Sequence, residues 1–192
     1  MLFTRSDIPS ISPVSARPIP APNRFPIVEE DNNVLDKISI FLGGTCNGSK
    51  WRDKLIPMLN YKFEPFNPVV DDWNEEAQER EVYHRMNDDF VLYCITPMMT
   101  GFYSIAEMID DMNKRPLKTI VCFLYEDGNG RHGYTIPQLK SVDAVLKMLK
   151  DNNVPAFTSL EVLAEYLNIV VIEGRTNYNG WWKLLYAILG LF

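Results

Sequence analysis

The chain has 192 residues, enough for one sizeable domain and too few for two ordinary ones. Its 46% hydrophobic and 12% aromatic content indicates a globular protein with a substantial core and excludes a disordered chain. The formal net charge of −6 excludes the broad basic surface that binds a nucleic-acid polymer, although helix N-terminal amides can still bind a small nucleotide.

The first segment, residues 1–34, contains six of the 13 prolines and shows no helical or alternating apolar period. Because proline fixes φ and lacks an N–H, we expect an extended arm that is ordered by packing on its own domain, a sister subunit or a partner. The N-terminus also lacks the long apolar core of a signal peptide, so export is not supported.

From residue 37 the chain alternates between apolar runs and helical stretches. Strands are predicted over residues 37–44, 61–70, 89–96, 118–124 and 154–157, and helices over residues 49–59, 74–88, 104–115, 139–153 and 159–167. Asn47 or Ser49 is the expected cap of the first helix. Buried strands alternating with helices predict an α/β fold, a parallel sheet covered by helices on both faces.

The C-terminal segment, residues 174–192, is apolar but shorter than the roughly 20 residues that span a bilayer. We interpret it as a helix docked on the body or on a neighbouring subunit, with interfacial membrane binding as a minor alternative. The predicted organisation is therefore an arm over residues 1–34, an α/β domain over residues 35–173 and a docking segment over residues 174–192.

Three predicted strands end in segments that would meet at one edge of a parallel sheet, where α/β folds bind ligands. The first segment contains Gly43, Gly44 and Thr45, where glycines let the backbone approach a ligand and the following amides can hold an anion or a sugar hydroxyl. It is neither a G-x-G-x-x-G nor a Walker motif, and an ordinary strand-to-helix turn explains it about equally well.

The second segment offers Asn67, Asp71, Asp72 and Trp73. Asp72 could bind ribose hydroxyls while Trp73 forms a wall for a base. Alternatively, Asp71 or Asp72 caps the acidic helix that follows, which is the commonest use of aspartate in that position.

The third segment leads to Glu107, which apolar residues surround in the sequence. Ser104 and Glu107 fit a Ser-x-x-Glu capping box, which spacing alone favours. Asp88 and Asp89 lie at the start of the third predicted strand, where acids are normally solvated boundary residues. Against this, a carboxylate nucleophile and an acid on separate segments are what glycosidic chemistry requires.

The cysteines and histidines do not indicate a metal site or a histidine-based mechanism. Cys46, Cys94 and Cys122 form no Cys-x-x-Cys pair, and only two histidines occur. Cys94 and Cys122 lie within apolar runs, where a thiol is usually a small buried hydrophobe, and this suits a reducing cytoplasm.

Taken together, residues 41–52, 66–73, 87–111 and 113–123 resemble the nucleoside 2-deoxyribosyltransferase-like proteins, in the branch common in bacteria and bacteriophages. The resemblance covers residues 37–124, with the motifs in the right order. It implies a flavodoxin-like domain that often forms dimers or larger oligomers. It also implies a small-molecule nucleoside or nucleotide substrate and no cofactor.

The resemblance assigns roles residue by residue. Glu107 matches the glutamate that attacks C1′ of a 2′-deoxynucleoside, and Asp89 matches the aspartate that handles the leaving base. Gly43 and Gly44 match the loop that lines the pocket. The aspartate that transferases carry shortly before the nucleophile has no counterpart, since residues 100–103 read Thr-Gly-Phe-Tyr.

Asp72 could replace this aspartate, or Tyr103 and Ser104 could hold Glu107 by hydrogen bonds. The leading hypothesis is therefore N-glycosidic transfer or hydrolysis through a ribosyl-enzyme intermediate in the cytoplasm of a bacterium or of an infected host. The alternative is a structural or accessory module, bacteriophage-derived and virion-associated, that assembles through its arm and tail.

Overall fold

The computed structural model describes residues 37–127 and 133–171. The predicted arm and the predicted C-terminal docking segment lie outside these residues. The boundary between two units of the chain falls between Val34 and Leu35, and everything described below belongs to the second unit.

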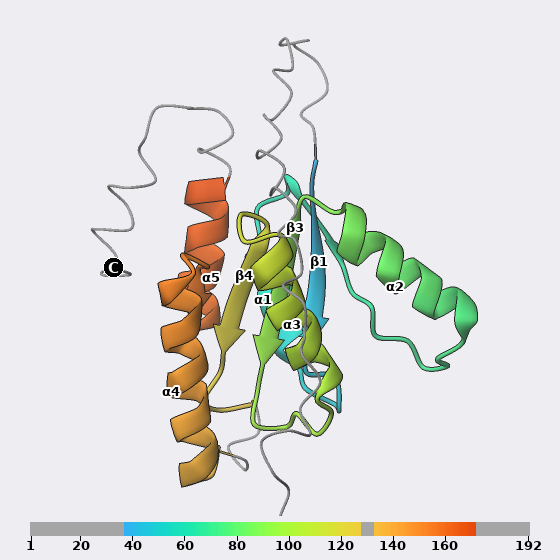
Figure 1. The fold of residues 1–192 in the computed structure, drawn as a ribbon. Coiled ribbons are helices and arrows are strands. Elements are labelled where there is room, and N and C mark those ends of the chain that lie inside the picture. Colours follow the sequence, from blue (N-terminus) through green and yellow to red (C-terminus); the bar gives the residue numbers. More distant parts are fainter. Residues whose placement is uncertain (1–36, 128–132, 172–192) are drawn as a thin grey trace, which may run out of the picture. The chain divides into compact units, whose positions relative to one another are not determined.

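Five parallel strands form one sheet in the order β2-β1-β3-β4-β5. The strands are β1 (Ile38–Gly44), β2 (Phe63–Phe66), β3 (Phe90–Ile95), β4 (Thr119–Phe123) and β5 (Ala156–Phe157). The helices between them are α1 (Trp51–Leu55), α2 (Glu75–Asn87), α3 (Tyr103–Lys114), α4 (Ile136–Asp151) and α5 (Leu160–Tyr166) (Figure 1). This strand order confirms the predicted α/β fold and is the flavodoxin-like one.

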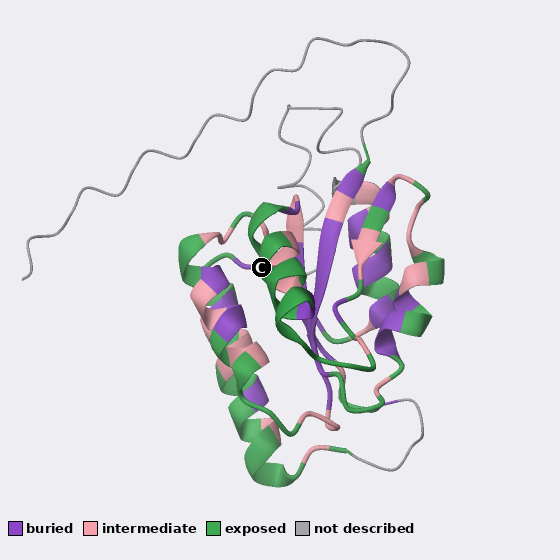
Figure 2. Ribbon diagram, turned by 90° about the vertical axis from the view of Figure 1, so that its right-hand side faces the viewer, coloured by how far each residue is buried: buried purple, intermediate pink, exposed green. Residues whose placement is uncertain are grey.

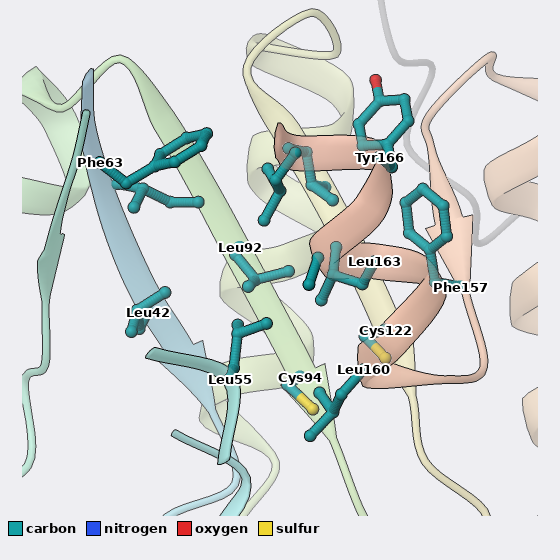
Figure 3. Packing of buried hydrophobic residues seen from close by; sticks show 14 of the residues in the cluster. Leu42, Leu55, Phe63, Leu92, Cys94, Cys122, Phe157, Leu160, Leu163 and Tyr166 are labelled. Carbon is teal, nitrogen blue, oxygen red and sulfur yellow. The ribbon is translucent and has the colours of Figure 1, made fainter. Parts of the chain in front are cut away.

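The three inner strands are buried along nearly their whole length, so their side chains pack on both faces of the sheet (Figure 2). On one face α1 and α5 cover a cluster that includes Leu42, Leu92 and Leu163 (Figure 3). On the other face, Met108 of α3 and Leu149 of α4 pack against strand residues that point the opposite way. A continuous apolar run in each strand is what a sheet covered on both sides requires.

The outer strands are short. β2 has four residues and includes Pro65, which pairs in register with Ile40, and β5 has two residues. β2 is therefore shorter than the predicted strand over residues 61–70. Cys94 and Cys122 lie opposite each other in β3 and β4, both buried and both free thiols, which confirms their predicted burial.

Several helix starts differ from the predictions. Lys50 rather than Asn47 or Ser49 precedes α1, with no side-chain cap, and α1 gives way to a 3-10 turn over Ile56–Met58 that contains Pro57. α4 begins at Ile136, three residues before the predicted start, because the Gln138 side chain accepts a hydrogen bond from the Thr135 N–H. No helix among the described residues is long and apolar enough to cross a membrane.

Candidate active site at the carboxyl edge of the sheet

The loops after β1 and β3 lie side by side at the carboxyl edge of the sheet. Thr45 Oγ1 accepts a hydrogen bond from the Thr96 N–H at 2.9 Å, and the Asn47 side chain donates to Met98 O at 3.1 Å. The second loop leads into α3, where Ser104 Oγ lies 3.5 Å from Gly44 O. The first turn of α3 therefore lies against the end of β1.

Glu107 lies one turn further into α3, with only 8% of its surface exposed. Phe102 is the residue before the helix, so Ser104 and Glu107 both lie inside it and no capping box forms. The capping-box interpretation is therefore wrong. The carboxylate faces α2 instead, where Glu107 Oε1 pairs with Arg85 Nη1 at 3.3 Å.

Arg85 connects three elements beside Glu107. Its Nε donates to Asp111 Oδ2 at 3.0 Å and to Tyr93 Oη at 2.9 Å, and its Nη2 donates to Asp111 Oδ1 at 3.0 Å. The Tyr93 hydroxyl in turn donates to Asp111 Oδ2 at 2.6 Å. Glu107 thus belongs to a buried ionic network between α2, α3 and β3.

The surroundings change the acidity of this carboxyl group. Burial raises the pKa of Glu107 to about 7; the positive charge of Arg85 opposes the rise, while the carboxylates of Glu81 and Asp111 add to it. Burial also raises the pKa of Glu81, on α2. Glu107 is therefore partly ionised near neutral pH, in the range where a carboxyl group can act as a nucleophile or exchange a proton.

Residues 37–121 match the family model described as nucleoside 2-deoxyribosyltransferase like. Over these residues the chain is similar to the nucleoside 2-deoxyribosyltransferase-like family. The match runs from β1 into β4 and includes Glu107 and Arg85. A comparison with curated proteins gives no match.

The two glycines that end β1, Gly43 and Gly44, are required by close packing. Gly44 has a φ of +109°, and a Cβ there would lie 2.1 Å from Cys94 O. A Cβ on Gly43 would lie 2.8 Å from the rings of Phe41 and Tyr93. Packing alone therefore accounts for both glycines, and no ligand is needed to explain them. Both lie on β1, the strand against which α3 begins.

Thr45, also predicted to bind substrate, is buried within the fold. Its backbone N–H donates to Cys94 O at 2.9 Å, and its carbonyl oxygen accepts from the Trp51 indole at 3.0 Å and from Arg52 Nη1 at 2.9 Å. These bonds hold the β1 loop in place. Tyr103, another residue predicted to bind substrate, lies at the start of α3 and has 72% of its surface exposed.

Asn67, Asp72 and Trp73 lie on the connection between β2 and α2, which leaves the sheet at the same carboxyl edge. All three are exposed, and Asn67 Oδ1 accepts a hydrogen bond from the Val69 N–H at 3.1 Å. Asn74 is the residue that caps α2, since its side chain accepts from the Ala77 N–H at 2.9 Å. The interpretation of Asp71 or Asp72 as the cap is therefore wrong.

Asp89 lies at the other edge of the sheet. Its Oδ2 accepts hydrogen bonds from the Ser39 N–H at 2.9 Å and from the Ser39 hydroxyl at 3.1 Å, where β1 and β3 begin. Four residues of extended strand, about 13 Å, separate Asp89 from Tyr93. Glu107 lies beyond Tyr93, toward the carboxyl edge, so one subunit does not bring Asp89 and Glu107 together.

Sequence reasoning missed Arg85, Tyr93 and Asp111, which surround Glu107. Asp111 follows Glu107 by four residues and so shares its helix face, a spacing that could have been found. Nothing in the sequence indicated Arg85 and Tyr93, because they belong to other elements. Among the described residues, no three His, Cys, Asp or Glu side chains are grouped so as to hold a metal ion.

Proposed function

We propose that this domain breaks the N-glycosidic bond of a nucleoside or nucleotide, with Glu107 as the nucleophile. The observation that carries the proposal is the buried Glu107 carboxylate, held beside Arg85 one turn below the carboxyl edge of the sheet. The match to the deoxyribosyltransferase-like family supports it, because the matched segment includes this residue.

In the first step a Glu107 carboxylate oxygen attacks C1′ of the sugar. The C1′–O bond forms while the C1′–N bond breaks, and the bonding electron pair leaves with the base. In the second step a nitrogen of another base, or a water molecule, attacks C1′ and the electron pair of the ester bond returns to Glu107. In transfer, the departing base gains the proton that the incoming base loses, whereas in hydrolysis water supplies it.

Exposed residues at the same edge are available for substrate binding. We propose that Trp73 and Tyr103 contact the base, and that Asp72 and Asn67 bind sugar hydroxyls. Their exposure at the ends of β2 and β3 supports these roles. Asp89 receives no part in this scheme, because its hydrogen bonds to Ser39 lie at the opposite edge.

The test is to incubate the protein with 2′-deoxynucleosides, with and without a second free base, and to separate the products by chromatography. Exchange of the base would show transfer, and release of free sugar would show hydrolysis. Glu107→Gln removes the nucleophile and should lower the rate by about 10³-fold or more. Glu79→Gln, an exposed change on α2, should leave it unaltered.

The covalent intermediate gives a second measurement. Acid quenching during turnover should leave wild-type protein heavier by one deoxyribosyl group, attached to the peptide that contains Glu107. Glu107→Gln protein should show no such increase in mass. The proposal would be refuted by a complete absence of both exchange and hydrolysis, or by a full rate in Glu107→Gln.

A further inference from the structure

The guanidinium group of Arg85 is fixed on one side and faces Glu107 on the other. Its Nε and Nη2 form a fork on the two carboxylate oxygens of Asp111, and Nε also contacts the Tyr93 hydroxyl. Nη2 lies 3.3 Å from the Glu107 carbonyl oxygen as well. The remaining nitrogen, Nη1, is the one that pairs with Glu107 Oε1.

Asp111, which anchors this fork, is itself held firmly. Its side chain is almost completely buried and forms an ion pair with Arg115, four residues further along α3. Arg115 also donates from Nη1 to the backbone carbonyl of Arg85 at 2.7 Å. Both the side chain and the backbone of Arg85 are therefore tied to α3, so the end of α2 cannot shift without breaking several bonds.

We propose that Arg85 is the positioning residue that fixes the Glu107 carboxylate for attack on C1′, an inference that rests on the proposed function. A planar arginine fork fixes direction as well as charge, which a lysine ammonium does not. Arg85 pairs with Oε1, and no hydrogen bond to Oε2 is present within residues 37–127 and 133–171. Oε2 is then the oxygen that reaches the sugar.

The same arrangement suits both steps of the reaction. When Glu107 becomes an ester it loses its charge, yet Arg85 keeps Asp111 as its partner and does not become an unpaired buried cation. When the ester breaks, the returning negative charge develops opposite a guanidinium that is already in place. Such preorganised charge stabilises a transition state without reorganisation.

The groups that face Glu107 come from three elements. Arg85 and Glu81 belong to α2, Asp111 to α3 and Tyr93 to β3. Arg85 is the one positive charge among these four groups, and Arg115, the other cation of the network, pairs with Asp111 and not with Glu107. The acid–base titration of Glu107 therefore reports directly on Arg85.

The experiment uses full-length protein with glutamate ¹³C-labelled at the side-chain carboxyl carbon. The Glu107 resonance is the one that disappears in Glu107→Gln, and its chemical shift is followed against pH in wild type, Arg85→Gln and Arg85→Lys. Arg80→Gln, an exposed arginine on the same helix, is the matched control. The pH dependence of kcat is measured on the same four proteins.

In Arg85→Gln the titration midpoint of Glu107 should rise by about one pH unit or more above wild type, since an opposite charge at this distance is removed. The acid limb of the kcat profile should move by the same amount. Arg85→Lys should give an intermediate midpoint but a lower kcat than wild type, because it keeps the charge and loses the fork. Arg80→Gln should match wild type in both.

An unchanged Glu107 midpoint in Arg85→Gln would overturn the inference, as would a shifted midpoint with an unmoved acid limb. If Arg85→Gln fails to fold, Arg85→Lys provides the test. The inference would be overturned if Arg85→Lys had the same Glu107 midpoint and the same kcat as Arg80→Gln. If wild-type protein cleaves no nucleoside, the proposed function fails on its own, and the carboxyl titration still shows whether Arg85 governs Glu107.

Discussion

Glu107 lies where ionisation of a carboxyl group costs free energy. Its pKa rises from an ordinary value of 4.5 to about 7, first because it is buried, and the carboxylates of Glu81 and Asp111 add to this. The difference corresponds to about 3 kcal/mol between the protonated and ionised forms. At neutral pH the folded protein bears part of this cost.

This cost makes stability depend on pH in a definite direction. Because the pKa of Glu107 is higher in the folded state, its contribution to stability is full below about 4.5 and is lost as pH rises through about 7. Relative to Glu107→Gln, which cannot ionise, wild type should lose up to about 3 kcal/mol between pH 4.5 and 8. Urea unfolding of both proteins at several pH values measures the difference.

Glu107→Gln also loses the ion pair with Arg85, which shifts its free energy of unfolding relative to wild type. The prediction therefore concerns how the difference between the two proteins changes with pH. Glu79→Gln, exposed on α2, should follow the wild-type curve at every pH. Parallel curves for wild type and Glu107→Gln would contradict the raised pKa.

Gly44 ends β1 and pairs in register with Cys94 of β3. In Gly44→Ala, the added Cβ would lie 2.1 Å from Cys94 O, a backbone atom that cannot move without disturbing both strands. With a φ of +109° as well, we expect a loss of about 3 kcal/mol or more in the free energy of unfolding.

Gly101→Ala is the control for this substitution, because a Cβ at that position has nothing within 4 Å. Its free energy of unfolding should stay within about 0.5 kcal/mol of wild type. Equal stability of the two alanine variants would show that the close contact at Gly44 is relaxed in solution.

At the scale of elements, strands were easier to predict than helix ends. The apolar runs of β1, β3 and β4 are long enough to specify buried strands by themselves. A cap depends instead on the backbone geometry of one residue, and Asp71, Asp72 and Asn74 all carry a side chain that can act as one. Sequence composition does not choose among them.

The cap of α2 gives a direct test at this scale. Asn74→Ala removes the acceptor for the Ala77 N–H and should lower the free energy of unfolding by about 1 kcal/mol. Asp72→Ala, at one of the two positions that the sequence indicated for the cap, should change it by less than about 0.5 kcal/mol. Thermal or urea unfolding of the two variants distinguishes the caps, and the opposite order would restore the sequence-based interpretation.

The candidate site was predictable only in part, for a similar physical reason. Glu107 could be found because a glutamate among apolar neighbours is unusual and because the motif around it resembles a family. Arg85 and Tyr93 could not, because their contacts with Asp111 join three elements whose relative placement only the folded sheet provides. Asp89 took its role in handling the leaving base from resemblance alone; it lies where the sequence predicted, at the start of β3, and its hydrogen bonds there are to Ser39.

For the molecule as a whole, the sheet separates two cores. The cluster under α1 and α5 contains Leu163, and the cluster on the other face contains Met108, the residue next to Glu107. The Glu107 network belongs to the second face. A substitution in the cluster under α1 and α5 should therefore lower stability without altering the surroundings of Glu107.

Leu163→Ala tests this separation. Leu163 is fully buried, so its truncation should cost about 2–5 kcal/mol in the free energy of unfolding. The titration midpoint of Glu107 should remain at its wild-type value, as measured from the carboxyl resonance. A shifted midpoint in Leu163→Ala would show that the two faces are coupled through the sheet.

The short outer strands have a consequence for how this protein meets others. Within the described residues the sheet ends in β2, whose Pro65 lacks an N–H, and in β5, which is two residues long. Few backbone groups are left in line for a further strand, so neither edge is a good template for strand addition or fibril growth. Copies of this domain that associate should do so through side chains on helices and loops, and not by joining their sheets edge to edge.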